Sequence, residues 1–258
     1  MARLLSLAAG VHPDLEPSTM VSTAAAAGWP ACGIWCDPTT WSNTTTMEVR
    51  RRLDDTGVVA LDLEPIIPTP GIDDHGEYVI DVAAEIGAQH VLFTSRLPDL
   101  SATIERFASL CAIAAQHGVK LVCEFLPIFP LSSLRMAMQV VGDHPPGTAG
   151  ILVDNLHLAR SGGSVADLTA VPLNLMPYLQ IADAAGPTPH TAADLLEEAV
   201  HGRLLPGEGD LPIKDLLVAV PNVALSFEVR STALHERFPD PVDRARHLFE
   251  RVCTYADR

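Results

Sequence analysis

Eight short apolar segments, each followed by a longer segment with helical spacing, constrain the fold of this chain more than any other feature. A buried parallel strand is a run rich in Val, Ile and Leu, and a helix returns the chain to the start of the next strand. Eight such units in 258 residues match the length of a (β/α)8 barrel. We therefore predict an α/β fold in which residues 1–258 form a single TIM-barrel domain. The predicted strands are Leu4–Val11, Ala31–Cys36, Val58–Leu63, His90–Thr94, Lys120–Phe125, Gly150–Val153, Tyr178–Ala182 and Val223–Val229.

The segments between these strands predict the helices. Gly28 and Gly57 stand where two of them should end, because glycine readily adopts the left-handed conformation of a helix C-cap. An open, doubly wound sheet is the alternative fold. It would favour a glycine-rich nucleotide loop after the first strand, and Ala8–His12 contains no such loop. The predicted helices are Pro17–Ala27, Thr46–Asp55, Glu77–Ile86, Ala102–His117, Leu131–Val141, Ala192–Val200, Ile213–Val218 and Pro241–Tyr255.

The acidic composition limits the partners of the chain. Its formal net charge is −15 at pH 7, so we expect no binding to nucleic acid or to an anionic membrane surface. Five cysteines without disulfide-like spacing favour reduced thiols and a cytoplasmic location. We interpret Cys32 and Cys36 as core residues rather than as a zinc pair. The apolar run near the N-terminus reads as a first strand rather than a signal peptide, and no run reaches membrane-spanning length.

Polar residues stand at the predicted carboxyl ends of the strands, where the active sites of barrels lie. The fifth to eighth strands end on Glu124, Asp154, Gln180 and Glu228. Oxygen donors of this kind suit Mn²⁺ or Mg²⁺, and three carboxylates without a cation would force at least one to stay protonated. We therefore predict that these four residues bind one divalent metal. The alternative is that the acids pair with arginines, namely Arg96, Arg160, Arg203 and Arg230.

Five segments resemble a known family. They are Val122–Phe125, Val153–His157, Tyr178–Asp183, Leu205–Gly209 and Phe227–Val229, and they are similar to the sugar phosphate isomerase/epimerase family of xylose-isomerase-like TIM barrels. The resemblance is strong in the second half of the chain and is carried only by topology in the first half. It implies a barrel with one divalent metal held by Glu, Asp, a His or Gln, and Glu. The family includes ketose epimerases, sugar isomerases and dehydratases.

The resemblance also implies a reaction. We expect a metal-dependent isomerase or epimerase that acts on a small, sugar-like hydroxy-carbonyl compound through an enediolate. Glu124 and Glu228 would act as the acid/base pair. His157 would orient a substrate hydroxyl or shuttle a proton, and its structural alternative is to cap the next helix or to bond Asp154.

Further residues near predicted strand ends complete the predicted substrate site. Arg230 would bind an anionic group, and Glu64, His12, Trp35 and Phe93 would line the pocket. For Glu64 and His12 a structural role is equally consistent with the sequence, and for the aromatic residues the alternative is barrel packing. We also expect Asp183 to accept a hydrogen bond from a loop amide and Glu208 to brace the turn that contains it.

Gln180 keeps a second reaction open. Many epimerases of the family have a His at this position, and a Gln amide cannot act as a titrating base. Gln here resembles the 3-dehydroshikimate dehydratases of the same superfamily, so a metal-dependent lyase is the alternative. A catalytically silent barrel and a phosphodiester-cleaving enzyme are less favoured, the latter because the chain has no basic DNA-binding face. A Schiff-base mechanism is disfavoured because neither Lys120 nor Lys214 ends a strand. Whether the barrel forms a homodimer is left open.

Overall fold

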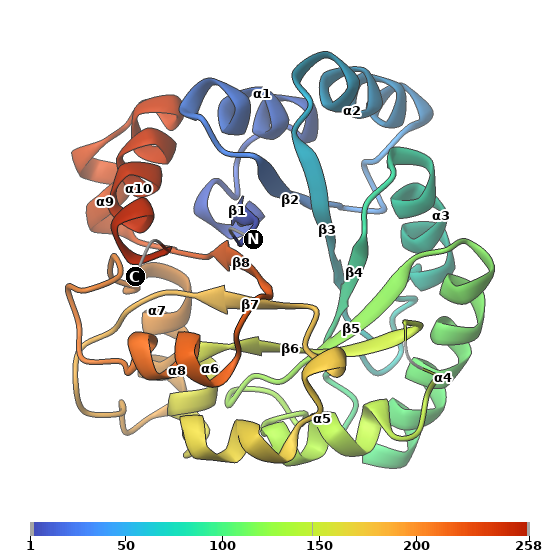
Figure 1. Ribbon diagram of the computed structural model, residues 1–258. Coiled ribbons are helices and arrows are strands. Elements are labelled where there is room, and N and C mark those ends of the chain that lie inside the picture. Colours follow the sequence, from blue (N-terminus) through green and yellow to red (C-terminus); the bar gives the residue numbers. More distant parts are fainter. Residues whose placement is uncertain (1–2, 146, 257–258) are drawn as a thin grey trace.

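Eight parallel strands form a closed barrel in the computed structural model, which describes residues 3–145 and 147–256 (Figure 1). Each strand pairs with its neighbours in sequence, and the last closes onto the first through pairs such as Ser6 with Ser226. The predicted (β/α)8 fold is therefore confirmed. The strands are β1 Leu5–Leu7, β2 Ala31–Trp35, β3 Val59–Ile66, β4 His90–Phe93, β5 Lys120–Glu124, β6 Ala149–Asp154, β7 Tyr178–Ile181 and β8 Ala224–Phe227.

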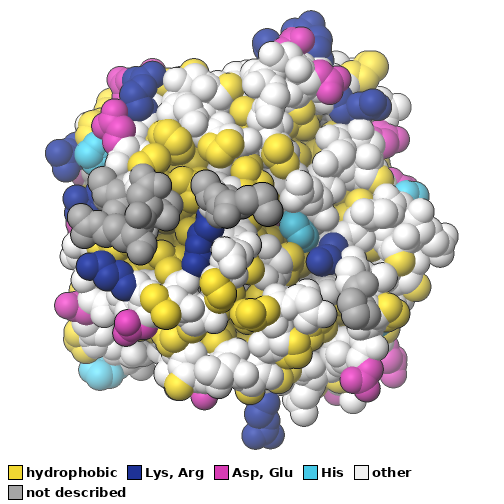
Figure 2. Space-filling view, viewed as in Figure 1, with side chains coloured by type: hydrophobic (Ala, Val, Ile, Leu, Met, Phe, Trp, Pro, Cys, Tyr) yellow, Lys and Arg dark blue, Asp and Glu magenta, His cyan; other side chains and the backbone are white. Residues whose placement is uncertain are grey.

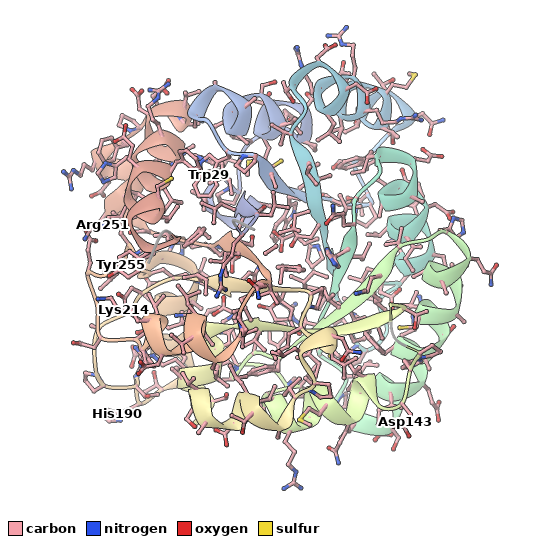
Figure 3. The ribbon with its side chains drawn as sticks, in the orientation of Figure 1. Trp29, Asp143, His190, Lys214, Arg251 and Tyr255 are labelled. Atoms are coloured by element: carbon pink, nitrogen blue, oxygen red, sulfur yellow. The ribbon has the colours of Figure 1, made fainter. Side chains whose placement is uncertain are left out.

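Helices surround the barrel on its outer side (Figure 1). Trp29 attaches the C-terminal helix to the barrel (Figure 3). Its Nε1 donates to the Ala245 carbonyl of that helix at 2.9 Å, and its ring packs on Phe249 of the helix and on Phe227 of the last strand. In the described ranges no helix is both long and apolar enough to cross a membrane. The α-helices are α1 Pro17–Ala27, α2 Asn43–Thr56, α3 Gly76–Ile86, α4 Leu100–Gln116, α5 Leu134–Val141, α6 Asn155–Arg160, α7 Ala192–His201, α8 Ile213–Ala219, α9 Thr232–Arg237 and α10 Pro241–Ala256, and the 3-10 helices are η1 Ala9–Val11, η2 Val165–Ala170 and η3 Leu173–Leu175.

Two of the predicted helix starts lie three residues from the observed ones, because side-chain caps, which spacing does not reveal, set where these helices begin. Helix α2 begins at Asn43 because Ser42 accepts a hydrogen bond from the Thr45 amide as its N-cap. Helix α5 begins at Leu134, not at Leu131, because Ser133 caps it in the same way.

The first strand is also shorter than predicted. It ends at Leu7, and Ala9–Val11 forms a 3-10 helix instead of continuing the strand to Val11. At Gly10 this turn passes so close to Glu228 that an added Cβ would collide with Glu228 Oε1. The absence of a side chain at Gly10 therefore leaves room for an acid at the barrel mouth.

A β-bulge in β3 sets which residues enter the barrel. The pairing of β2 with β3 shifts register between Cys32 and Gly33, whose partners are Ala60 and Asp62, so Leu61 is the extra residue. Leu61 belongs to an apolar cluster inside the barrel, and the Asp62 side chain also lies inside, where it meets β7. The remaining members of that cluster are Ala31, Leu92, Val122, Leu152 and Tyr178, and a larger apolar cluster lies between the strands and the helices.

Charged and apolar side chains occupy different parts of the surface. In the view of Figure 2 most charged side chains of both signs lie around the rim of the molecule, and apolar side chains gather nearer the middle. The cysteines interpreted as core residues, Cys32 and Cys36, are both buried in the large apolar cluster.

Candidate active site

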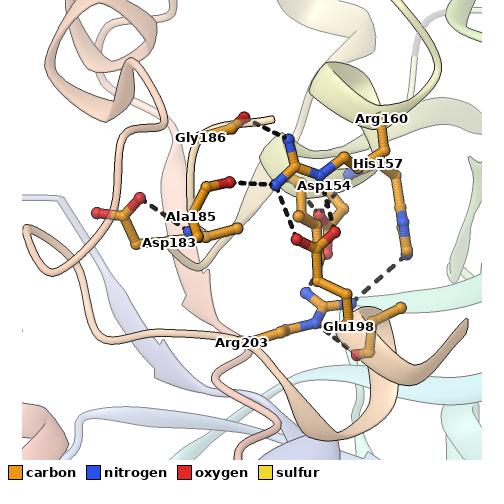
Figure 4. Close-up of polar contacts among 11 residues, drawn as sticks. Asp154, His157, Arg160, Asp183, Ala185, Gly186, Glu198 and Arg203 are labelled. Carbon is orange, nitrogen blue, oxygen red and sulfur yellow. Dashed lines mark hydrogen bonds and ion pairs between the residues drawn. The ribbon is translucent and has the colours of Figure 1, made fainter. Parts of the chain in front are cut away.

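Arg203 joins the ends of β6 and β8 at the mouth of the barrel. Its Nη1 lies 2.6 Å from Asp154 Oδ2, and its Nη2 lies 3.1 Å from Glu228 Oε2. Its Nε donates to the Ala199 carbonyl at 2.8 Å (Figure 4). The side chain is only 2% exposed. Burial opposes the charge, but the two carboxylates raise the pKa of Arg203, so the guanidinium stays protonated.

Asp154 connects this ion pair to the start of α6. Its Oδ1 accepts hydrogen bonds from the amides of Leu156 at 2.7 Å and His157 at 3.0 Å, so it is the N-cap of the helix. Burial opposes ionisation, but Arg203 and these donors outweigh it and lower the pKa of Asp154. Asp154 is therefore ionised at neutral pH.

Glu124, Asp154 and His157 form a group that fits a metal ion. Their ligand atoms all lie within 4.8 Å of one another, and His157 Nε2 lies 3.9 Å from Glu124 Oε1. Burial lowers the pKa of His157 to about 4, so its ring is neutral and can act as a ligand. Burial and the charges of Glu228 and Asp154 raise the pKa of Glu124 well above its usual value. A divalent cation would offset the repulsion between these carboxylates.

Gln180 provides an independent observation in favour of a metal. It pairs with Asp154 across β6 and β7, and it is 1% exposed. Among the described residues, neither its Oε1 nor its Nε2 has a hydrogen-bond partner. A buried polar group left unpaired costs about 1–3 kcal/mol, so an unpaired amide beside Asp154 calls for a ligand. The residues present therefore fit a divalent ion.

The alternative prediction, that arginines rather than a metal pair with the acids, is confirmed in part. Arg203 pairs with two of the four predicted metal ligands, as described above. Arg160 instead pairs with Glu198, at 2.7 Å, and donates to the Ala185 carbonyl, so it leaves the acids at the mouth free (Figure 4).

A pocket of about 200 Å³ opens beside these groups. Its wall combines acids, arginines and apolar side chains, with Phe129 lying 4.7 Å from the Arg96 guanidinium. Asp154 and Gln180 are not among the lining residues. The predicted site residues that line the pocket are Trp35, Glu64, Glu124, His157, Glu228 and Arg230.

Two predicted substrate-binding residues lie elsewhere. Leu92 and Thr94 line the pocket, but the alternation of β4 directs the ring of Phe93 outward, where it packs on Phe107 at 5.1 Å between centroids. His12 is buried, and its Nδ1 accepts a hydrogen bond from Arg244 Nη2 at 2.8 Å. Phe93 therefore packs against a helix, and His12 is held by Arg244; neither residue lines the pocket.

The chain before α8 holds Arg203 in place. The Arg203 amide donates to the Arg230 carbonyl at 3.0 Å, and the Leu204 amide donates to the Asp183 carbonyl at 2.8 Å. Asp183 Oδ2 accepts from the Gly207 amide at 2.8 Å, which confirms the expected hydrogen bond from a loop amide. Glu208 lies in the same turn, with Oε1 3.9 Å from Arg251 Nη2, away from the pocket.

The sequence did not single out Asp62 and Tyr178. The Tyr178 hydroxyl crosses the barrel from β7 and donates to Asp62 Oδ2 at 2.6 Å. Burial raises the pKa of Asp62 to about 6, although the Tyr178 hydrogen bond opposes this shift. The available signal was the spacing of Asp62 and Glu64, since two acids two positions apart share one face of a strand.

Comparisons with known proteins agree with this architecture. A curated relative, 3-dehydroshikimate dehydratase of Pseudomonas putida (strain KT2440), is 24% identical over an alignment of 212 residues that covers 76% of this chain. The chain spans 32% of that relative's length. The solved structure of the IOLI protein with a bound zinc atom superposes with a TM-score of 0.82 at 14% identity, covering 99% of this chain and 98% of that one.

A second solved structure is that of D-psicose 3-epimerase with D-tagatose from Clostridium cellulolyticum H10. It has a TM-score of 0.69 at 12% identity, with 97% of each chain covered. At such identities these structures show the fold alone. The model of the family described as xylose isomerase-like TIM barrel matches residues 21–250. This chain therefore belongs to the xylose isomerase-like TIM barrel family.

Proposed function

We propose that this protein is a divalent-metal-dependent isomerase or epimerase that acts on a small hydroxy-carbonyl compound. The observation that carries the proposal is that Glu124 and Glu228, from β5 and from the end of β8, line one pocket beside the Asp154–His157 group. Two carboxyls placed around one substrate can take a proton from carbon and return it. The similar proteins include an epimerase and a dehydratase. Both reactions can proceed through an enolate, so these similarities support proton abstraction beside a carbonyl.

Glu124, Asp154, Gln180 and Glu228 would hold the metal, with His157 as a further ligand, and Mn²⁺ or Mg²⁺ suits a set that is mainly oxygen. When bound, the metal supplies Lewis-acid stabilisation of negative charge on substrate oxygens. Arg203 keeps Asp154 ionised and fixes the position of Glu228 through its second nitrogen. Glu124 and Glu228 exchange the carbon-bound proton, and the neutral ring of His157 orients a substrate hydroxyl.

A panel of ketoses and inososes tests this proposal. The Mn²⁺- or Mg²⁺-loaded protein is incubated with each compound in deuterium oxide, and the recovered material is analysed by mass spectrometry. Deuterium at carbon in the substrate or its isomer supports proton transfer by the pocket carboxyls. Protein that binds no divalent metal, or that catalyses no exchange with any compound, would contradict the proposal.

Dehydration of a cyclic hydroxy ketone is the second candidate function. Two observations favour it. Gln180 lies in β7 at the predicted ligand position, and Arg96 and Arg230 both line the pocket, where Arg230 Nε has no hydrogen-bond partner among the residues described. Two such cations would bind an anionic substituent of the substrate, and 3-dehydroshikimate carries a carboxylate. An absorbing, conjugated product formed from 3-dehydroshikimate would identify this reaction.

A further inference from the structure

Two acids on β3 lie in the barrel interior outside the ion-paired set. Asp62 is fully buried, and Glu64, two positions further along the strand, is 3% exposed and lines the pocket. Glu64 Oε1 is buried without a hydrogen-bond partner within the part of the chain that the structure describes. Strand β3 stands opposite β7 in the order of the barrel, so Glu64 approaches a bound substrate from the side away from Asp154 and Gln180.

Gly33 makes room for this pair of acids. A Cβ at Gly33 would lie 2.7 Å from Asp62 Oδ1 and 3.4 Å from Glu64 Oε1. The register of β2 and β3, in which Gly33 pairs with Asp62 and Trp35 pairs with Glu64, brings these residues together. A residue with a side chain at position 33 would push one or both carboxyls from their places, so this part of the sequence is built to accommodate them.

The charges at the mouth require one carboxyl to hold a proton. Five buried carboxyls there interact with two guanidinium groups, those of Arg203 and Arg230. Arg96 also lines the pocket, but its side chain is exposed to solvent and lies over the Phe129 ring, so its charge is screened from the carboxyls. A divalent metal would offset two of the three excess negative charges, and a further isolated charge in this interior would cost several kcal/mol. One carboxyl therefore stays neutral even with metal bound. The five are Asp62, Glu64, Glu124, Asp154 and Glu228.

The contacts indicate which carboxyl this is. Asp154 and Glu228 are paired with Arg203, and Glu124 belongs to the metal-binding group. Asp62 accepts the short hydrogen bond from Tyr178, which stabilises its ionised form. Glu64 has none of these partners. Burial and the nearby charges of Asp62, Glu228 and Glu124 raise its pKa well above the usual value, and Arg230 opposes this only in part.

We propose that Glu64 is a further catalytic residue, a neutral carboxylic acid that donates its proton to a substrate oxygen on the side of the pocket away from Asp154 and Gln180. The role rests on the proposed function, because it serves the same enolate chemistry. In an elimination, a pocket carboxylate takes the proton from carbon and that electron pair forms the C=C bond. The C–O bond breaks with its pair on oxygen, and the Glu64 proton converts the departing hydroxide into water. After an elimination, the carboxylate releases the proton that it took from carbon to solvent, and Glu64 takes up a proton from solvent. In an isomerisation, the same Glu64 proton neutralises the substrate oxygen on which charge develops, and it returns to Glu64 when the carbonyl forms again.

Infrared spectroscopy of the full-length, Mg²⁺-loaded protein tests where the proton lies without needing a substrate. Protein labelled with ¹³C-glutamate should show, at pH 7, a protonated-carboxyl band that shifts with the label. The band should be lost in Glu64→Gln and kept in Glu197→Gln, which changes an exposed glutamate on α7. In Glu64→Asp, which also serves if the Gln variant does not fold, the band should return at the unlabelled position. A wild-type protein without the labelled band, or a Glu64→Gln protein that keeps it, would overturn the proposal.

Kinetics test the catalytic step separately. With whichever compound of the panel is turned over, Glu64→Gln should lower kcat by about 10²- to 10⁴-fold, with smaller changes in KM and in bound metal. The fall in rate at alkaline pH that reports the protonated acid should disappear in this variant. If the variant keeps the wild-type kcat, Glu64 is not the donor although the proposed function stands. If no compound is turned over by either protein, the proposed function fails, and the infrared result still decides whether Glu64 is neutral.

Discussion

Arg203 Nη1 lies 2.6 Å from Asp154 Oδ2, and both side chains are buried at the mouth of the barrel. The same carboxylate caps α6, and the same guanidinium reaches Glu228 at 3.1 Å. This pair therefore couples the ends of β6 and β8 to the helix that carries His157. Its loss should affect both stability and the geometry of the site.

Replacing Arg203 by Met should strongly destabilise the protein. Removing one member of a buried ion pair leaves an uncompensated charge and costs about 3–5 kcal/mol. Urea unfolding of metal-free protein measures the change. Arg246→Met is the control, because Arg246 pairs with Asp243 on the exposed side of α10 and should contribute at most about 1 kcal/mol. Equal effects in the two variants would show that the buried pair is not important for folding.

Replacing Gln180 by Leu should have opposite effects with and without metal. The change removes a buried amide without a hydrogen-bond partner among the described residues, so metal-free protein should gain about 1–3 kcal/mol in unfolding free energy. With Mn²⁺ present the gain should shrink or reverse, because a ligand is lost. Unfolding in chelator and in excess metal measures both values. Gln116→Leu, on the exposed end of α4, should show no such dependence on metal.

Replacing Glu228 by Gln should abolish turnover while leaving most of the metal bound. The amide keeps the shape and one oxygen donor of the side chain but cannot exchange a proton, so we expect a loss in kcat of at least about 10²-fold. Elemental analysis and steady-state kinetics give the two readouts. Glu208→Gln is the matched control, since Glu208 does not line the pocket. Unchanged turnover in Glu228→Gln would remove Glu228 from the acid/base pair.

Lowering the pH should destabilise the protein because buried histidines must take up protons. Replacing His90 by Gln measures how much one such histidine contributes. Burial lowers the pKa of His90 to about 4 from a usual 6.5, although the hydrogen bond with the Leu61 carbonyl opposes the shift. Between these values the unfolded chain binds more protons than the folded one, so stability falls as pH falls. From pH 7 to pH 4, wild type should therefore lose up to about 3 kcal/mol more than His90→Gln. The exposed His190, changed in the same way, should leave the wild-type pH dependence intact (Figure 3).

The barrel and much of its site could be predicted because strand ends have a clear sequence signal. Glu124 and Asp154 each follow an apolar run that only a buried strand explains, and the structure places both at the mouth. Phe93 could not be placed, because its direction depends on which residues of β4 face inward, and that parity is fixed by contacts with β3 and β5.

Other features depend on distant contacts or local irregularity. The bulge at Leu61 changes which residues of β3 face inward, and no periodic pattern predicts it. Arg203 lies in a connection between elements, so only the packing of its backbone against Asp183 and Arg230 reveals that it reaches the mouth. The sequence named Arg203 among four arginines that could pair with the acids, but spacing alone could not show which of the four reaches them.

The Tyr178–Asp62 hydrogen bond limits the path by which substrate enters the site and product leaves it. It spans the interior from β7 to β3, and Tyr178 packs in the same apolar cluster as Leu61 and Val122, which are almost completely buried. Among the residues that the structure describes, this cluster closes the barrel to a molecule of substrate. Reactants, products and the water that exchanges protons must then pass through the entrance at the carboxyl ends of the strands, and release of product must precede the arrival of the next reactant.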